Sequence, residues 1–325
     1  MGVSADKMVR KVAFLFPGQG SQYAGMGKSL YDNYSSAKEV FDIAEGILKW
    51  DIKGLCFNNF GDKINLTEYT QPAILVTSIA AWSILAKEKI RPDVVAGHSL
   101  GEYSAIVSAG GLALTDALPV VQLRGRFMQD AVQKESGMMA ALLGISRSDV
   151  IDVCKSATTS GEDIVTPANF NTPEQIVIAG TAGAVRKAME LAKGKGAKKV
   201  IRLNVSVPSH SPLMKPASQK LTEVLDNITF SSLKISLITN VDSVIVTDAG
   251  EIKDALVRQL TNPVKWDDAM QILIKDGYNT FVEVGPGRVL TGLQKRIAKE
   301  LQTTAELFNV EDVESFEKTL EGLRT

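Results

Sequence analysis

The chain has 325 residues, of which 45% are hydrophobic and 22% are charged, so its composition is that of a globular protein and excludes a disordered or coiled-coil chain. Its 36 Lys and Arg residues against 37 Asp and Glu residues give a net charge of −1, without the basic excess typical of nucleic-acid-binding proteins. The length fits about two domains, or one large α/β domain with an insertion.

The first part of the chain alternates short strands with helices. An apolar run at 12–16, closed by Pro17 and Gly18, predicts a buried strand that leads into a loop. The pattern then predicts, in chain order, helices at 36–48 and 71–89, a strand at 94–96, and helices at 102–109 and 115–132. This alternation favours an α/β architecture with a mostly parallel sheet.

The middle of the chain follows a different order. It predicts a strand at 138–144, a helix at 148–157, strands at 164–169 and 175–179 joined by Asn171-Thr172-Pro173, a helix at 182–192 and a strand at 198–205. The order βαββαβ is typical of a ferredoxin-like fold. We therefore expect an inserted subdomain at 135–204 and a larger core formed by 1–134 and 205–325. In the second core segment, strands at 234–239 and 280–284 resume, with helices between and after them.

Cysteine usage and hydropathy bear on where the protein works. Cys56 and Cys154 are the only cysteines, which excludes a disulfide framework or a Cys-rich zinc site and favours a reducing compartment. Residues 1–10 lack the apolar segment of a secretory signal. The apolar stretch at 72–86 is interrupted by polar residues and is expected to be too short to cross a bilayer. We therefore expect a cytoplasmic protein without membrane association.

The strongest chemical motif is Gly97-His98-Ser99-Leu100-Gly101, which matches the nucleophile elbow G-x-S-x-G. A strand is predicted before it and a helix after it, as that elbow requires. A serine on such a tight turn points into solvent, and the helix N-terminus behind it favours developing negative charge. The backbone N–H of Leu100 is then a candidate oxyanion donor. The alternative is an inert serine in a glycine-rich turn.

A nucleophilic serine needs a base, and the chain contains only two histidines. His98 is adjacent to Ser99, so its side chain is expected to point away and to have a supporting role. By elimination His210, in a loop bracketed by Pro208 and Pro212, is the candidate base. A lone histidine with a purely structural role is the alternative. The group that orients His210 is an Asp or a backbone carbonyl, and spacing does not choose between them.

The loop at 16–22 follows the first strand, where a second oxyanion donor is expected in this architecture. The loop also resembles phosphate-binding loops. The pattern G-x-G-x-x-G fails at Tyr23, and the Walker A pattern that would end at Ser29 fails at Gln22. These mismatches disfavour a nucleotide site.

Arg124 is a candidate substrate-binding residue. Its neighbours three and four positions away on the predicted helix are Val120, Val121, Phe127 and Met128, so it lies within the buried stripe. Burying a guanidinium costs several kcal/mol, on the order of 3–5, unless it is paired. Pattern alone favours a protein carboxylate as its partner, but bidentate binding of an acidic substrate also fits.

These residues, taken with further segments in the same order along nearly the whole chain, resemble the malonyl-CoA:acyl-carrier-protein transacylase family of fatty-acid synthesis. The matching segments are Phe16-Pro-Gly-Gln-Gly-Ser-Gln22, Thr70-Gln-Pro-Ala73, Gly97-His-Ser-Leu-Gly-Glu-Tyr-Ser104, Leu123-Arg-Gly125, Val205-Ser-Val-Pro-Ser-His210, Arg258-Gln-Leu260, Asn262-Pro-Val264 and Glu283-Val-Gly-Pro-Gly287. The resemblance implies an α/β hydrolase-like core with a parallel sheet and an inserted ferredoxin-like (βαββαβ) subdomain.

The same resemblance implies roles for individual residues. Ser99 would be the acylated nucleophile, His210 its base, and Arg124 the partner of the malonyl carboxylate. The remaining implied roles are an oxyanion hole from the backbone N–H groups of Gln19 and Leu100, orientation of the histidine by the main-chain carbonyl of Gln259, and pocket-lining positions at Gln71 and Asn169. No metal or cofactor is implied, and the expected substrates are malonyl-CoA and phosphopantetheinylated acyl carrier protein. We expect a monomer.

The implied mechanism is ping-pong acyl transfer through malonyl-Ser99, and three other functions remain open at this stage. A serine esterase or thioesterase would use the same Ser99 and His210. An acyltransferase for another extender unit, such as methylmalonyl, is a second possibility. A carrier-protein-docking module with a dead site is the non-enzymatic one, which the intact Ser99 and His210 disfavour.

Overall fold

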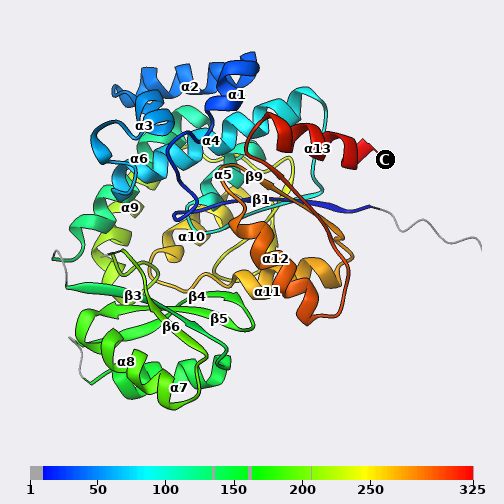
Figure 1. Ribbon diagram of the computed structural model, residues 1–325. Coiled ribbons are helices and arrows are strands. Elements are labelled where there is room, and N and C mark those ends of the chain that lie inside the picture. Colours follow the sequence, from blue (N-terminus) through cyan, green and yellow to red (C-terminus); the bar gives the residue numbers. More distant parts are fainter. Residues whose placement is uncertain (1–9, 134–135, 160–162, 206, 325) are drawn as a thin grey trace, which may run out of the picture.

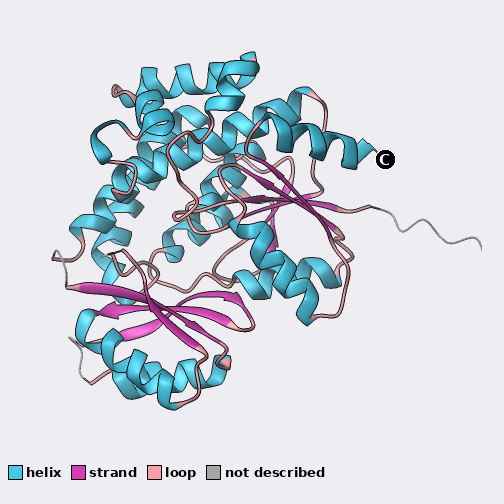
Figure 2. Ribbon diagram, in the orientation of Figure 1, coloured by secondary structure: helices cyan, strands magenta, loops and turns pink. Residues whose placement is uncertain are grey.

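Two separate β-sheets organise this chain, one with six strands and one with four, as Figures 1 and 2 show. The computed structural model describes residues 10–133, 136–159, 163–205 and 207–324. The segment 1–9, for which the sequence predicts no secretory signal, lies outside the described residues. So do the predicted subdomain boundary between residues 134 and 135 and, in the loop before His210, Ser206.

The larger sheet has the strand order β10-β9-β1-β2-β7-β8. Its neighbouring strands run parallel except for β7 and β8, which are antiparallel. The strands are β1 (Val12–Phe16), β2 (Val94–Gly97), β7 (Ser236–Ile238), β8 (Ile245–Val246), β9 (Thr280–Val284) and β10 (Glu306–Val310). Strands β1, β2 and β9 are almost entirely buried, which explains why they consist of near-continuous apolar runs.

Helices cover both faces of this sheet. Alternate residues of a strand point to opposite faces, and both faces carry apolar side chains that the helices bury. Phe14 and Phe16 of β1 join one large core cluster, whereas Ala13 and Leu15 join a second cluster with helices α11 and α12. The helices of this unit are α1 (Lys28–Asn33), α2 (Ser35–Leu48), α3 (Ile52–Asn58), α4 (Thr67–Lys87), α5 (Gly101–Ser108), α6 (Leu114–Asp130), α9 (Lys215–Asp226), α10 (Ala249–Gln259), α11 (Trp266–Lys275), α12 (Val289–Glu300) and α13 (Val313–Arg324), with short 3₁₀ turns at Phe60–Asp62 and Pro212–Met214.

Helix α4 corrects one expectation from the sequence. The apolar stretch at 72–86 is expected from the sequence to be too short to cross a bilayer, but the helix that contains it is longer and extends from Thr67 to Lys87. By length and composition alone these 21 residues could span a membrane. However, 78% of the most apolar window is buried inside the protein, and the helix packs against α2, α5 and α6. Helix α4 is therefore a core helix that is apolar on nearly all sides.

The smaller sheet is antiparallel and has the strand order β4-β5-β3-β6. Its elements are β3 (Gly137–Leu143), α7 (Arg147–Ala157), β4 (Val165–Thr172), β5 (Gln175–Thr181), α8 (Ala182–Gly194) and β6 (Lys199–Arg202). Helices α7 and α8 cover one face, at the bottom of Figure 1, and share a hydrophobic cluster with it. The expected fold class, a parallel-sheet core with a βαββαβ subdomain, is confirmed.

Several element boundaries differ from the sequence prediction. Strand β4 continues to Thr172, so Asn171 and Thr172 belong to the strand and not to the connection. Strand β6 ends at Arg202, short of the expected 205. The sequence pattern predicts neither helices α1, α3 and α9 nor strands β8 and β10, and most of these elements are short or carry few apolar residues.

Backbone and side-chain contacts join the two sheets. The N–H of Phe170 in β4 donates to the carbonyl oxygen of Val264 at 2.9 Å, and the N–H of Val264 donates to the carbonyl oxygen of Ala168 at 2.9 Å. Arg147 of α7 also donates to both carboxylate oxygens of Asp268 on α11, at 2.6 and 2.8 Å. The antiparallel sheet is thereby fixed over one end of the parallel sheet.

Candidate active site

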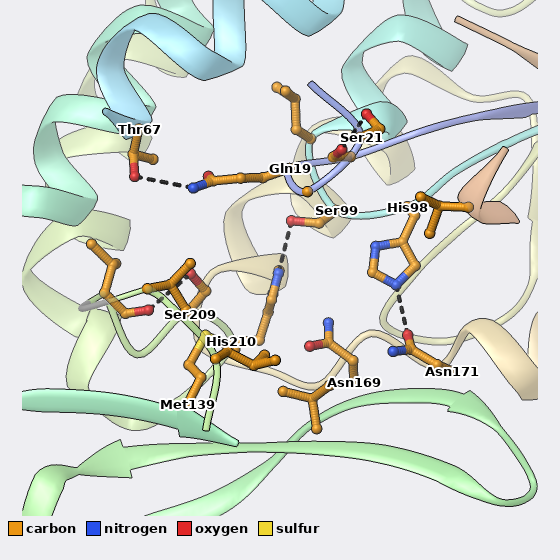
Figure 3. A pocket seen from close by; sticks show the side chains of 18 of the residues that line it. Gln19, Ser21, Thr67, His98, Ser99, Met139, Asn169, Asn171, Ser209 and His210 are labelled. Atoms are coloured by element: carbon orange, nitrogen blue, oxygen red, sulfur yellow. Dashed lines mark hydrogen bonds between the residues drawn. The ribbon is translucent and has the colours of Figure 1, made fainter. Parts of the chain in front are cut away.

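Ser99 occupies a sharp turn between β2 and α5. Its φ is 53°, in the left-handed region that a residue with a side chain rarely adopts. The turn is possible only because glycines flank it: a Cβ on Gly97 would overlap the main chain of Gly101, and a Cβ on Gly101 would overlap the carbonyl oxygen of Phe16. Backbone strain held in this way is typical of functional sites. The turn presents the Ser99 hydroxyl to the cavity (Figure 3).

Asn240 supports this turn from the neighbouring strand. It lies two residues beyond the end of β7, the strand beside β2 in the parallel sheet. Its Oδ1 accepts the backbone N–H of Ser99 at 2.8 Å, and its Nδ2 donates to the carbonyl oxygen of Gly97 at 2.6 Å. The side chain is buried, so the two bonds hold the backbone on both sides of His98 in a water-free environment.

His210 lies within hydrogen-bond distance of the serine. The Ser99 hydroxyl donates to Nε2 of His210 at 2.8 Å, and Nδ1–H of His210 donates to the main-chain carbonyl oxygen of Gln259 at 2.8 Å. Burial and, to a smaller extent, the nearby Arg124 cation together lower the pKa of His210 to about 3. The imidazole is therefore neutral near pH 7 and can accept a proton from Ser99.

Arg124 of α6 is 1% exposed and lies beside the same serine. Its Nη1 donates to Oε1 of Gln71 at 2.8 Å, and its Nη2 donates to Oε1 of Gln259 at 2.8 Å and to the Ser99 hydroxyl at 3.2 Å. Within the described ranges it forms no ion pair, and its Nε has no hydrogen-bond partner. All the direct hydrogen-bond partners of the guanidinium are neutral, so an acidic ligand would complete its pairing.

Two residues that line the cavity, Gln19 and Leu100, have backbone N–H groups without an acceptor among the described residues. The Gln19 side chain is held separately by the Thr67 hydroxyl, at 3.4 Å. Free N–H groups beside a nucleophile, one of them at the start of helix α5, are suited to an oxyanion.

The site opens into a cavity of about 340 Å³, a size typical of small-molecule sites. Elements of both sheets line it. On the antiparallel side the wall is apolar and includes Met139, Ala141 and Val177, and Asn169 lies on this side too (Figure 3). Gln71 of α4 lines the opposite side.

The His98 side chain points away from that of Ser99, as expected (Figure 3). Its Nε2 lies 2.8 Å from Oδ1 of Asn171 on β4, and its ring packs against Trp266 with ring centroids 5.4 Å apart. Burial lowers the pKa of His98, so the neutral ring donates Nε2–H to the asparagine. The contact links the serine turn to the antiparallel sheet.

The structure thus brings together Ser99, His210, Arg124, Gln71, Gln259, Gln19, Leu100 and Asn169 around one cavity. Sequence reasoning missed Glu102 and Asn240. Glu102 could have been found by the criterion applied to Arg124, because its helix neighbours Ala105 and Ile106 are apolar. Asn240 could have been suspected as a polar residue at the carboxyl end of a parallel strand.

No group of three or more side chains suited to bind a metal ion occurs within the described ranges. The two cysteines are free and buried, and neither is among the residues that line the cavity. The positions of Ser99, His210 and Arg124 suit nucleophilic attack by Ser99, with a neutral imidazole as base, on a substrate that carries a negative group near the reacting carbon.

Comparison with known proteins gives consistent matches over the whole chain. Residues 13–318 match the acyl transferase domain family. The malonyl CoA-acyl carrier protein transacylase of Bacillus subtilis is 45% identical over 314 residues, which cover 97% of this chain and 98% of that protein. The crystal structure of an acyl carrier protein S-malonyltransferase from Vibrio cholerae has a TM-score of 0.91 at 42% identity, covering 95% of this chain and 99% of that one. A malonyl-transacylase in complex with its type II polyketide synthase acyl carrier protein has a TM-score of 0.92 at 40% identity, covering 96% and 99%.

Proposed function

This chain is an acyltransferase that belongs to the malonyl-CoA:acyl carrier protein transacylase family, and we propose that it transfers the malonyl group from malonyl-CoA to the phosphopantetheine thiol of acyl carrier protein. The observation that carries the proposal is the position of Arg124. A buried guanidinium without a carboxylate partner lies 3.2 Å from the Ser99 hydroxyl, where a malonyl group attached to that oxygen would place its free carboxylate within reach.

In the first half-reaction, Oγ of Ser99 attacks the thioester carbon of malonyl-CoA while Nε2 of His210 takes the hydroxyl proton. The carbonyl oxygen becomes an oxyanion, which the N–H groups of Gln19 and Leu100 stabilise. The carbon–sulfur bond then breaks, and the proton on His210 goes to the departing CoA thiolate. The product is a malonyl ester of Ser99 with free CoA.

In the second half-reaction, the phosphopantetheine thiol of acyl carrier protein attacks the ester carbon. His210 takes the thiol proton and returns it to Oγ of Ser99 when the ester bond breaks, which restores the free enzyme. Gln259 keeps His210 in the tautomer that this exchange needs, because its main-chain carbonyl accepts Nδ1–H and leaves Nε2 free to accept a proton.

Arg124 would hold the malonyl carboxylate in both half-reactions. A bidentate pair with the carboxylate fixes the acyl group relative to Ser99 and offsets the burial of the charge. Gln71 supports the guanidinium from the side opposite to Gln259, and Asn169 borders the acyl group from the antiparallel sheet. The reaction needs only the thioester malonyl-CoA and the phosphopantetheine thiol of acyl carrier protein, and we propose no metal or cofactor for it.

Intact-mass measurement after mixing the protein with malonyl-CoA tests the proposal. We expect one malonyl group to be added, to persist in the absence of a thiol, and to be removed by phosphopantetheinylated acyl carrier protein. The Ser99→Ala variant is the control and should take up no malonyl group. An esterase or thioesterase would instead release malonate without a persisting adduct, and a protein that docks carriers without catalysis would form none.

A competition experiment tests the acyl group. With equal concentrations of malonyl-CoA and methylmalonyl-CoA, we expect the malonyl adduct to dominate; a dominant methylmalonyl adduct would identify another extender-unit transferase. We further propose that the protein acts in the cytoplasm. We also propose that residues 1–134 together with 205–325 form its catalytic core and that residues 135–204 form its subdomain.

A further inference from the structure

Glu102 is a buried carboxylate that the reaction above does not use. It lies in the first turn of α5 and is 1% exposed. Its Oε1 accepts the backbone N–H of Asn240 at 3.0 Å, and its Oε2 accepts an N–H of the Gln259 side-chain amide. Burial raises the pKa of Glu102 to about 7, whereas the N–H donors and the Arg124 cation oppose that rise. Both oxygens accept hydrogen bonds, which is the geometry of the ionised form.

The Gln259 amide can point in only one direction in this setting. Its Nε2 donates to Oε2 of Glu102 and, at 2.9 Å, to the carbonyl oxygen of Ser99, and both partners only accept hydrogen bonds. Its Oε1 must therefore face the other way, where Nη2 of Arg124 donates to it at 2.8 Å. A flipped amide would set its NH₂ group against the N–H groups of the guanidinium.

We propose that Glu102 is a positioning residue for malonyl selectivity, which acts by holding the Gln259 amide in the direction that fixes the Arg124 guanidinium beside Ser99. The inference rests on the proposed function, because it assumes that Arg124 binds the malonyl carboxylate. Glu102 touches neither substrate nor reacting atoms in this scheme. It acts through Gln259, whose side chain is fully buried between the carboxylate and the guanidinium.

The variant Glu102→Gln separates this role from a simple charge effect. The backbone N–H of Asn240 cannot turn, so the introduced amide must give its oxygen to that donor and present its NH₂ group to Gln259. Two NH₂ groups then oppose each other, and the Gln259 amide loses its fixed direction. If Glu102 acted only as a negative charge near Arg124, its neutralisation would strengthen malonyl binding. The two roles therefore predict opposite changes.

The experiment measures single-turnover acylation of Ser99 by malonyl-CoA and by acetyl-CoA, which lacks the carboxylate that Arg124 would bind. In Glu102→Gln we expect the ratio of malonyl to acetyl rate constants to fall roughly tenfold, the cost of misdirecting one buried hydrogen bond. The matched control is Asn240→Ala, which keeps the backbone N–H but loses the side-chain bonds to the serine turn. It should slow both acylations by the same factor and leave the ratio unchanged.

A second variant keeps the test independent of folding. Glu102→Asp retains the charge but is one methylene shorter, so it cannot reach both Asn240 and Gln259, and we expect the same fall in the ratio. Thermal melting establishes that each variant is folded. A ratio that rises or stays constant in either folded variant overturns the proposal. The wild-type protein tests the proposed function separately, because its failure to form malonyl-Ser99 would leave no malonyl rate to compare.

Discussion

The two sheets contribute different groups to one cavity. The parallel-sheet unit supplies Ser99, His210 and Arg124, and each of them is held by at least one further hydrogen bond within that unit. The antiparallel sheet supplies an apolar wall and two asparagines, Asn169 and Asn171. The groups to which we assign proton transfer and acylation thus lie on the parallel unit, while the antiparallel sheet forms the opposite wall of the cavity.

The topology of the parallel sheet explains this division. The carboxyl ends of parallel strands meet at one edge, and ligand sites form there. Strand β1 leads into the loop that contains Gln19, β2 leads into Ser99, and β7 leads into Asn240, so three neighbouring strands deliver their following residues to the same place. An antiparallel sheet has no such edge, and its contribution comes from one face.

Removal of the base should have the largest effect on the parallel-sheet side. His210 has a φ of 60°, which asparagine tolerates better than most residues. In His210→Asn, the new amide can still donate to the Gln259 carbonyl, but nothing reaches Ser99. We expect the rate of malonyl-Ser99 formation to fall about 10³- to 10⁴-fold, towards the upper end of what general-base catalysis contributes. Intact-mass time courses measure this rate. A folded variant that acylates at the wild-type rate would remove His210 from the mechanism.

Replacement of the cation should have a smaller and more selective effect. In Arg124→Ala, a malonyl carboxylate would be buried without its partner, and truncating one member of a buried charge pair costs roughly 2–5 kcal/mol. We expect malonyl acylation to fall at least about 30-fold, whereas acetyl acylation and hydrolysis gain relative to it. Arg126 on the same helix is solvent-exposed, so Arg126→Ala is the matched control. An unchanged acyl preference in Arg124→Ala would break the link between that residue and malonyl.

The sequence predicts the parallel-sheet side of the site better than its surroundings. Ser99 follows from a local motif with the strand and helix that it needs, and Arg124 follows from helical periodicity. Both signals lie within a few residues. Gln259 and Asn240 contact the Ser99 backbone from 160 and 141 positions away, each through its side-chain amide, and no spacing in the sequence encodes such contacts. The place of Asn240 follows only once the strand order is known, whereas Gln259 is expected from the family resemblance alone, as the residue whose main-chain carbonyl orients His210.

The antiparallel sheet shows the same limit for the fold. Its βαββαβ order is predictable because each element has a clear period, and it is confirmed. The end of β4 is not predictable from the sequence, because Asn171 and Thr172 precede a proline and are residues typical of a turn. In the structure the strand continues through them, and the hydrogen bond between Asn171 and His98 is part of what holds them there. Tertiary contacts override local preference at that point.

The pH dependence of acylation sharpens the comparison on the parallel-sheet side. The pKa of His210 is lowered to about 3, so the neutral base persists far below the ordinary histidine value, and the acid limb of kcat/KM should lie well under pH 6.5. Arg124 contributes to that lowering, and its removal should therefore move the acid limb to higher pH. Acetyl-CoA is the substrate to use, because it does not need Arg124. An acid limb near pH 6.5 in the wild type would contradict the buried, neutral base.

The smallest effects should separate the two asparagines on the antiparallel side. Asn171 accepts Nε2–H of the half-buried His98, and Asn171→Ala leaves that donor without its partner, which costs about 1 kcal/mol of unfolding free energy. The Asn169 side chain has no hydrogen-bond partner among the described residues and lines the cavity, so Asn169→Ala should leave stability nearly unchanged and raise the KM for malonyl-CoA a few-fold. Urea denaturation and steady-state kinetics on both variants measure the two quantities. The two residues lie two positions apart on one strand, so equal losses of stability would show that this sheet has only a general packing role. A loss of stability in Asn171→Ala alone, with a raised KM in Asn169→Ala alone, would assign Asn171 to joining the two units and Asn169 to the substrate.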